Sequence, residues 1–78
     1  MKLSYDPRYN IAYIRLRSKS SEVESLKISD ELILDIDTDG TIYGIELLNA
    51  NEQLRREEGK LSLVNEATGE ETSIQFPV

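Results

Sequence analysis

Four acidic residues have the types and the spacing of a calcium-binding loop. Asp35, Asp37 and Asp39 alternate along the chain, Gly40 follows, and Glu46 comes after five intervening residues. In an EF-hand loop this pattern supplies carboxylate oxygens at alternate positions, a sharp turn at the glycine and a bidentate glutamate. The chemistry open to this set is the binding of a hard divalent cation such as Ca²⁺.

The segments on either side of this loop favour strands, whereas an EF-hand needs a helix on each side. Leu32, Leu34 and Ile36 alternate before the turn, and β-branched and aromatic residues follow it. Asp39-Gly40 is also a strong hairpin signal, because both central residues of a type I′ turn need a positive φ. We therefore predict a β-hairpin with a two-residue turn at this point.

The apolar pattern also predicts the register of this hairpin, because a slip of one residue would turn the apolar side chains to the other face. The expected pairs are Thr38 with Thr41, Ile36 with Tyr43, Leu34 with Ile45, and Leu32 with Leu47. The opposite face is mixed and carries Ile33, Asp35, Asp37, Ile42, Gly44 and Glu46. A cation could bind there and relieve the repulsion between like charges. The alternative is a solvated polar face beside a tight turn, where Asp is favoured.

The expected fold class is α+β, mostly β: an antiparallel meander of four to five strands, one short helix and a C-terminal hairpin. Alternation predicts strands at about 2–6, 10–17 and 22–28, with a polar loop at 18–21. We expect a single small domain over residues 1–78.

The second half of the chain predicts the helix and a further hairpin. Asn49 and Glu52 have the spacing of a capping box, and the helix is expected to continue to Glu58 and to stop at Gly59. Residues 60–78 are expected to form the C-terminal hairpin, with Gly69 in the left-handed position of a four-residue turn.

Composition narrows the possible chemistry. The 78 residues include no cysteine, which excludes disulfides, thiolate zinc sites and thiol catalysis. They include no histidine, the commonest general base and transition-metal ligand. A sheet of this size with one short helix leaves little room for a deep pocket. We therefore expect no enzyme and no cofactor.

The net charge of −6 indicates which classes of macromolecule the chain is expected to bind. A negative field repels phosphate backbones, so nucleic-acid binding is not expected despite Tyr5, Tyr9 and Tyr13. The same field suits docking onto a basic protein partner. No apolar run is long enough to span a membrane, and the N-terminus lacks the apolar core of a signal peptide. A cytoplasmic location is the expectation.

Self-association is expected as well. A chain this short has a thin core, and without disulfides an oligomer is the remaining route to added stability. Ile11 and Tyr13 beside Ile33 and Ile42 would form an apolar patch on the outer sheet face, which is a candidate interface. The alternative is scattered exposure, which is common on protein surfaces.

Three stretches, in this order, resemble one known family. They are Met1–Pro7 with Ala12–Leu16, then Ile28–Asp30 leading into Leu32–Asp37, then Asp39-Gly40 with Gly44–Ala50. Over roughly residues 1–54 the chain is similar to small bacterial and archaeal proteins catalogued as domain of unknown function 2283. Residues 59–78 depart from the usual short or proline-rich ending of that family.

The resemblance implies a small fold rich in antiparallel strands and no established activity, so no catalytic residue is carried across. Some members have neighbouring genes for small toxin-like ribonucleases, which implies an antitoxin-like role. The leading hypothesis is thus a non-enzymatic protein-interaction module. The rival hypothesis is divalent-cation binding through Asp35, Asp37 and Glu46.

Overall fold

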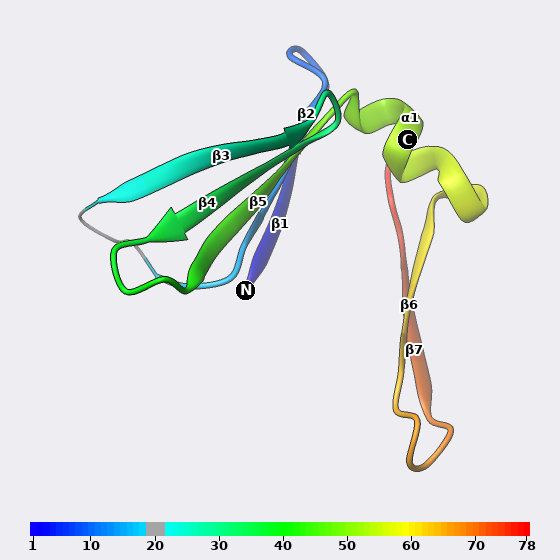
Figure 1. Ribbon diagram of the computed structural model, residues 1–78. Helices are drawn as coiled ribbons and strands as arrows, with labels where there is room; N and C mark the ends of the chain where they lie inside the picture. The colour runs from blue at the N-terminus through cyan, green and yellow to red at the C-terminus, as the bar shows by residue number, and fades with distance from the viewer. Residues whose placement is uncertain (19–21) are drawn as a thin grey trace.

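The chain folds into one open sheet, a short helix and a separate hairpin (Figure 1). The computed structural model describes residues 1–18 and 22–78. The sheet strands in these ranges are β1 (Lys2–Asp6), β2 (Ile11–Arg15), β3 (Val23–Ser29), β4 (Leu32–Asp37) and β5 (Ile42–Leu48). They are followed by α1 (Ala50–Arg55), the 3₁₀ turn η1 (Arg56–Gly59), β6 (Lys60–Val64) and β7 (Glu71–Gln75). The predicted class, mostly β with one short helix and a C-terminal hairpin, is confirmed.

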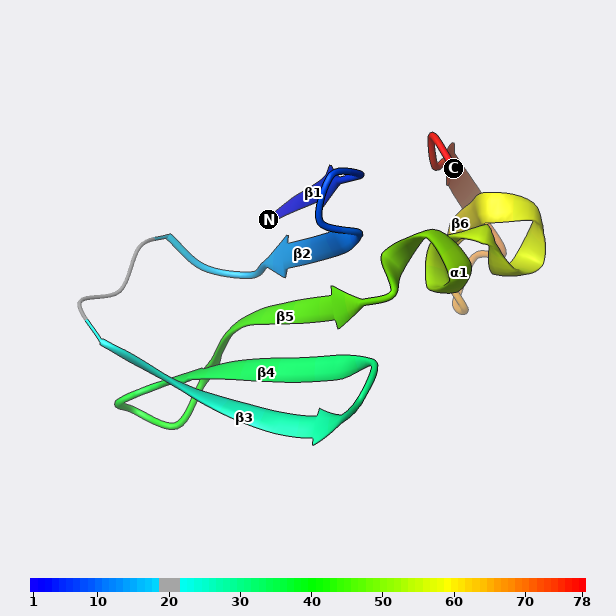
Figure 2. The same cartoon turned by 90° about the horizontal axis from the view of Figure 1, so that it is seen from above.

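The strand order differs from a meander. It is β1-β2-β5-β4-β3, with antiparallel neighbours throughout, so β2 lies beside β5 and β3 forms an edge (Figure 2). The pairing of β2 with β5 places Ala12 opposite Leu47 and Ile14 opposite Ile45, which matches apolar residues on one face. The polar loop expected at 18–21 falls mostly on residues 19–21, which lie outside the described residues.

The calcium-loop motif forms the β4–β5 hairpin, as predicted, but the turn is of another type. The Asp37 N–H donates to the Thr41 carbonyl at 2.8 Å, and the Gly40 N–H donates to the Asp37 carbonyl at 2.9 Å. Gly40 has φ +87°, whereas Asp39 is not among the residues with positive φ. A type I′ turn needs both, so the chain forms a three-residue loop closed by a left-handed glycine.

The extra loop residue changes the register near the turn. Leu34 lies opposite Ile45 and Leu32 opposite Leu47, as predicted. Nearer the loop the register shifts, and Ile36 lies opposite Ile42 instead of Tyr43. The shift is a bulge, in which two residues of β5 oppose one residue of β4.

Pairing across the five strands defines two faces of the sheet. The inner face carries mainly apolar residues, namely Leu3, Tyr5, Ala12, Ile14, Leu26, Leu32, Leu34, Ile36, Ile42, Ile45 and Leu47, together with Glu24 and Ser29 on β3. The outer face carries Lys2, Ser4, Asp6, Ile11, Tyr13, Arg15, Val23, Ser25, Lys27, Ile33, Asp35, Asp37, Gly44, Glu46 and Leu48. Among the described residues the inner face is therefore mostly apolar, with polar residues only on the edge strand β3, and the outer face is mixed.

The core occupies only one end of the inner face. Its buried residues are Ala12, Ala50 and Leu54, and the partly buried side chains packed against them are Leu3, Tyr5, Leu47, Phe76 and Val78. No large side chain is fully buried among the described residues. Helix α1 and the C-terminal tail thus cover the β1–β2 side and leave the rest of the face open.

The N-terminus of helix α1 is capped by a residue from another part of the chain. Asn49 has φ +51° and makes no side-chain cap, so the predicted capping box is wrong. Asn10, in the β1–β2 turn, takes over this role. Its carbonyl accepts the Ala50 N–H at 3.0 Å, and its side-chain oxygen accepts the Asn51 N–H at 2.7 Å.

The helix is also shorter than predicted. It ends at Arg55, because Glu57 and Glu58 have positive φ values of 52° and 61°. Gly59, at φ +71°, then leads the chain into β6. No helix in the described residues is long and apolar enough to cross a membrane.

The C-terminal hairpin follows the prediction closely. Asn65 donates its N–H to the Glu70 carbonyl at 2.8 Å, and its own carbonyl accepts the Gly69 N–H at 2.7 Å. Gly69 has φ +79°, the left-handed position expected for a four-residue turn. The hairpin arm (residues 60–75) extends away from the sheet (Figure 1).

Candidate functional site

Asp35 is the centre of a hydrogen-bonded cluster on the outer face. Its Oδ2 accepts the Tyr13 hydroxyl at 2.6 Å, and its Oδ1 accepts the Ser25 hydroxyl at 2.6 Å. Tyr13 lies on β2, Asp35 on β4 and Ser25 on β3. Both oxygens of the first residue in the calcium pattern are thus bonded within the sheet.

Gly44 allows the Tyr13 side chain to extend across β5 to Asp35. This glycine lies on β5 directly opposite Asp35, between the strands of donor and acceptor. A Cβ at this position would overlap the Tyr13 ring, at 2.7 Å from its Cε1. The absent side chain therefore leaves the space in which the ring crosses β5.

The environment of Tyr13 keeps its phenol protonated. Partial burial, followed by the hydrogen bond to Asp35, raises the pKa of the Tyr13 hydroxyl well above its usual value near 10. Burial acts in this direction because it disfavours the charged phenolate. Tyr13 is thus a hydrogen-bond donor here and a weaker acid than a free tyrosine.

Asp37 and Asp39 lie at the hairpin loop and share one arginine. Arg17 Nη1 lies 3.3 Å from Asp37 Oδ2 and 3.2 Å from Asp39 Oδ2. Thr41 donates its hydroxyl and its N–H to Asp39 Oδ1 at 2.6 and 3.0 Å. The Thr41 hydroxyl, its N–H and Arg17 together lower the pKa of Asp39 to about 2. Arg17 was not among the residues predicted from the sequence to contact these carboxylates.

The structure separates the proposed cation ligands into two groups. Asp35 and Glu46 are diagonal neighbours on the outer face, whereas Asp39 lies in the loop beside Arg17. Across residues 1–18 and 22–78, no three acidic side chains come close enough to hold one metal ion. Calcium binding by this set stays a prediction.

The predicted outer patch is altered by the register. Ile11, Tyr13 and Ile33 share the outer face, as expected, but Ile42 lies opposite Ile36 on the inner face, which corrects its predicted position. Glu46 lies opposite both Tyr13 and Ile33, so a carboxylate stands between them. The interface predicted from these residues is therefore not a continuous apolar surface.

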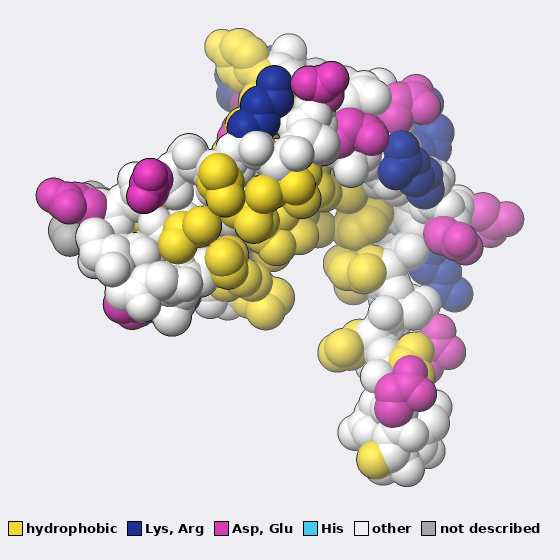
Figure 3. Space-filling model, in the orientation of Figure 1, with side chains coloured by type: hydrophobic (Ala, Val, Ile, Leu, Met, Phe, Trp, Pro, Cys, Tyr) yellow, Lys and Arg dark blue, Asp and Glu magenta, His cyan; other side chains and the backbone are white. Residues whose placement is uncertain are grey.

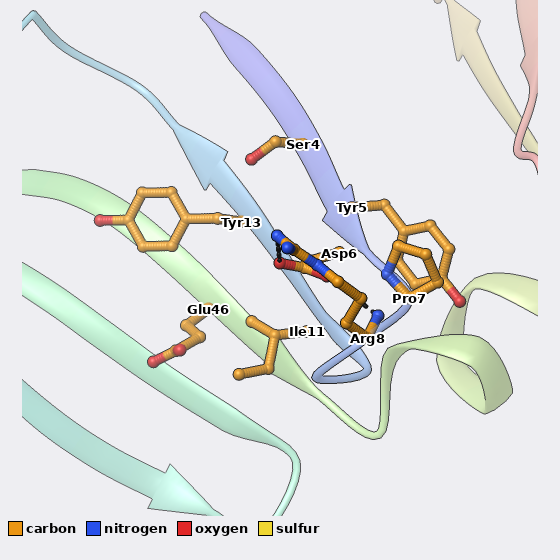
Figure 4. Close-up of a pocket in the computed structure, with 8 residues that line it drawn as sticks. All are labelled: Ser4, Tyr5, Asp6, Pro7, Arg8, Ile11, Tyr13 and Glu46. Atoms are coloured by element: carbon orange, nitrogen blue, oxygen red, sulfur yellow. Dashed lines mark hydrogen bonds and ion pairs between the residues drawn. The ribbon is translucent and has the colours of Figure 1, made fainter.

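An open hollow of about 540 Å³ lies beside this patch (Figure 4). It is lined by Ser4, Tyr5, Asp6, Pro7, Arg8, Ile11, Tyr13 and Glu46. Arg8 folds back over it and donates from Nε and Nη2 to the two oxygens of Asp6, at 3.1 and 3.0 Å. This pairing lowers the pKa of Asp6. Arg8 and Asp6 thus neutralise each other, and the carboxylate of Glu46 adds a negative charge to the lining.

The open part of the inner face is the main feature that the sequence analysis missed. Figure 3 shows apolar side chains gathered over the sheet beside the hairpin arm. Leu26 and Ile28 on β3 are 49% and 52% exposed, and the central residues of the face are only half-buried. The sequence indicated this open face through its short helix, because Leu54 is the one large side chain that the helix buries against the sheet.

These features define a small antiparallel β protein whose apolar sheet face is largely uncovered. The chain belongs to the family described as "Protein of unknown function (DUF2283)", whose family model matches residues 2–51. The match covers β1 to the start of α1 and leaves the hairpin arm outside. Searches among curated proteins and among solved structures find no significant match.

Proposed function

We propose that this chain is a non-enzymatic protein-interaction module that binds a protein on the inner face of its sheet. The observation that supports this function is the open apolar surface over β3, β4 and β5. Contiguous exposed apolar patches are rare on monomeric proteins and mark interaction sites. The partner covers the part of the inner face that the short helix leaves exposed.

Burial energetics favour such a partner. The buried core consists of two alanines and Leu54, which together remove little apolar surface from water. Burial of apolar surface contributes roughly 25 cal/mol per Å², or about 1.5–3 kcal/mol for a fully exposed leucine or isoleucine, so covering a side chain that is already partly buried adds a fraction of this. Several such side chains, among them Leu34, Ile36 and Ile45, lie on the open face.

The charge of the chain supports a basic partner, as in an antitoxin-like module. Exposed glutamates lie at both ends of the hairpin arm: Glu57 and Glu58 precede it, and Glu66, Glu70 and Glu71 surround its tip. Such charges accelerate association with a basic protein and hold it at the rim of an apolar contact. This contribution weakens as salt screens the charges.

A matched pair of substitutions on β3 tests the proposal. Leu26 and Val23 are 49% and 43% exposed, and the register places Leu26 on the inner face and Val23 on the outer face. In pull-downs from the source lysate, wild type and Val23→Lys are expected to retain the same stoichiometric protein, and Leu26→Lys is expected to lose it. Equal recovery by both variants would contradict binding at the inner face.

A further inference from the structure

The hairpin arm is an amphipathic ribbon with an uncovered apolar face. Leu61 lies opposite Ile74, and Leu63 lies opposite Thr72, so these four side chains share one face. The three apolar residues are 52%, 50% and 75% exposed, for Leu61, Ile74 and Leu63 in turn. The other face carries Lys60, Ser62, Val64, Glu71, Ser73 and Gln75. A two-stranded hairpin alone is marginally stable, so this apolar face needs a covering surface.

The molecule as a whole exposes more surface than a compact chain of its size. Its accessible surface is 5928 Å², against about 4,800 Å² expected for a folded monomer of this mass. Its radius of gyration is 14.0 Å, against about 11.5 Å expected for a compact domain of this length. The surplus of roughly 1,100 Å² exceeds the ~800 Å² that each partner buries in a standard interface.

The two uncovered surfaces belong together. Figure 3 shows apolar side chains on the sheet and on the side of the hairpin turned toward it, with open space between them. Two hydrogen bonds join the base of the arm to η1. The Phe76 N–H donates to the Gly59 carbonyl at 2.8 Å, and the Gln75 side chain donates to the Glu58 carbonyl at 2.8 Å. These bonds hold the start of β6 and the end of β7 against η1.

We infer that the occupant of this space is the hairpin arm of a second copy of the chain, and that the two chains exchange arms in a two-fold dimer. The inference rests on the proposed function and names a second copy of the chain as the occupant of the inner face, so that a basic partner would meet the exposed glutamates of the arm instead. An isologous contact pairs the arm of each chain with the inner face of the other, so both apolar surfaces are covered at once and the assembly closes. The amount of surplus surface matches this arrangement.

Substitutions on the arm provide the first test, by sedimentation equilibrium of the full chain. Leu63→Asp is expected to weaken the wild-type dimer about a hundredfold, because the symmetric interface contains this residue twice. Val64→Asp is the matched control, since the neighbouring residue points to the polar face. A monomeric wild type, or equal weakening by both variants, would overturn the inference.

A mixing experiment separates arm exchange from any other dimer. Leu63→Asp removes the arm surface and Leu26→Lys removes the sheet surface, so each protein alone is expected to be monomeric. In an equimolar mixture one unmodified arm meets one unmodified sheet, and a heterodimer is expected to form. A mixture that stays monomeric, while far-ultraviolet spectra show both proteins folded, would overturn the exchange.

A spin label identifies whose arm covers the sheet. Because the chain contains no cysteine, Thr68→Cys places a single label at the tip of the arm. When labelled chains are mixed with ¹⁵N chains, amide signals of β3 and β4 are expected to broaden. Unbroadened β3 and β4 signals in the ¹⁵N chains would overturn the inference. The pull-down comparison of Leu26→Lys with Val23→Lys would still test the proposed function separately.

Discussion

The Tyr13 hydroxyl donates a 2.6 Å hydrogen bond to Asp35 from a strand that is not its neighbour. The ring crosses β5 in the space left by Gly44. Asp35, which the calcium pattern offered as the first ligand, is instead the acceptor that ties β2 and β3 to β4. The outer face thus has a structural role that is independent of the partner on the inner face.

Replacing Tyr13 by phenylalanine is expected to lower the free energy of unfolding by about 1 kcal/mol, since a hydrogen bond to a carboxylate is lost at a half-buried position. Urea denaturation at neutral pH measures this change. Tyr9→Phe serves as the control, because Tyr9 is 71% exposed. An equal loss in both variants would contradict the role of the Tyr13–Asp35 bond.

The raised pKa of Tyr13 predicts the alkaline behaviour of the fold. The native state holds the phenol protonated, so its contribution to stability is complete below the ordinary pKa near 10 and declines as the pH rises beyond it. We expect wild type to lose stability more steeply than Tyr13→Phe above pH 10. The absorbance of phenolate, followed during titration, should lack the latest transition in the variant. Identical alkaline profiles would contradict this.

Gly44→Ala tests the space that Tyr13 occupies. The added methyl group overlaps the ring, so the variant is expected to break the hydrogen bond to Asp35 and to destabilise the fold by about 1–3 kcal/mol. In a Tyr13→Ala background the collision is absent, and the same substitution should be neutral or stabilising, since alanine disfavours a strand less than glycine does. Additive effects of the two substitutions would contradict the steric argument.

The β4–β5 hairpin shows which features of the fold the local sequence pattern predicts and which it does not. Alternation predicted the strands and the pairs Leu32–Leu47 and Leu34–Ile45 correctly. Asp-Gly is compatible with a two-residue turn and with a three-residue loop closed by glycine, so the sequence did not separate them. One extra loop residue was enough to move Ile42 to the other face.

The candidate site depended on contacts between distant residues, which a pattern of neighbours does not contain. Asp35 is 22 residues from Tyr13 and 10 from Ser25, and Asp39 is 22 from Arg17. The same holds for the helix start, where the cap comes from Asn10. Strand order was also undetermined, because both β3 and β5 offered apolar alternation to β2.

Asn10 is expected to connect the first hairpin to the helix. Asn10→Ala removes the acceptor of the Asn51 N–H and places alanine, which tolerates a left-handed backbone less well than asparagine, at φ +57°, so it should cost about 1–2 kcal/mol. Asn10→Gly relieves the backbone but not the cap, and should cost less. Thermal unfolding of the three proteins gives this order. Equal stability of the alanine and glycine variants would mean that the left-handed backbone contributes nothing.

Asp39 predicts a stability change in acid. Because its native pKa is lowered to about 2 from 3.8, its contribution is complete above about pH 4 and is lost as the pH falls toward 2. In Asp39→Asn the side chain cannot titrate, so the urea midpoint should depend less on pH over this interval. Asp30→Asn, in the exposed β3–β4 turn, is the control. Equal slopes in wild type and Asp39→Asn would assign the acid transition to other groups.

The bonds that already occupy Asp35 and Asp39 predict that calcium does not stabilise the fold. A cation at Asp35 would compete with the hydroxyls of Tyr13 and Ser25, and one at Asp39 would compete with Arg17 and with two donors from Thr41. A ligand that binds only the folded state raises the melting temperature, so calcium and chelator buffers compare directly. We expect the same melting temperature in both. A higher value in calcium, abolished by Glu46→Gln, would show that a cation displaces these internal bonds and would support the cation-binding hypothesis.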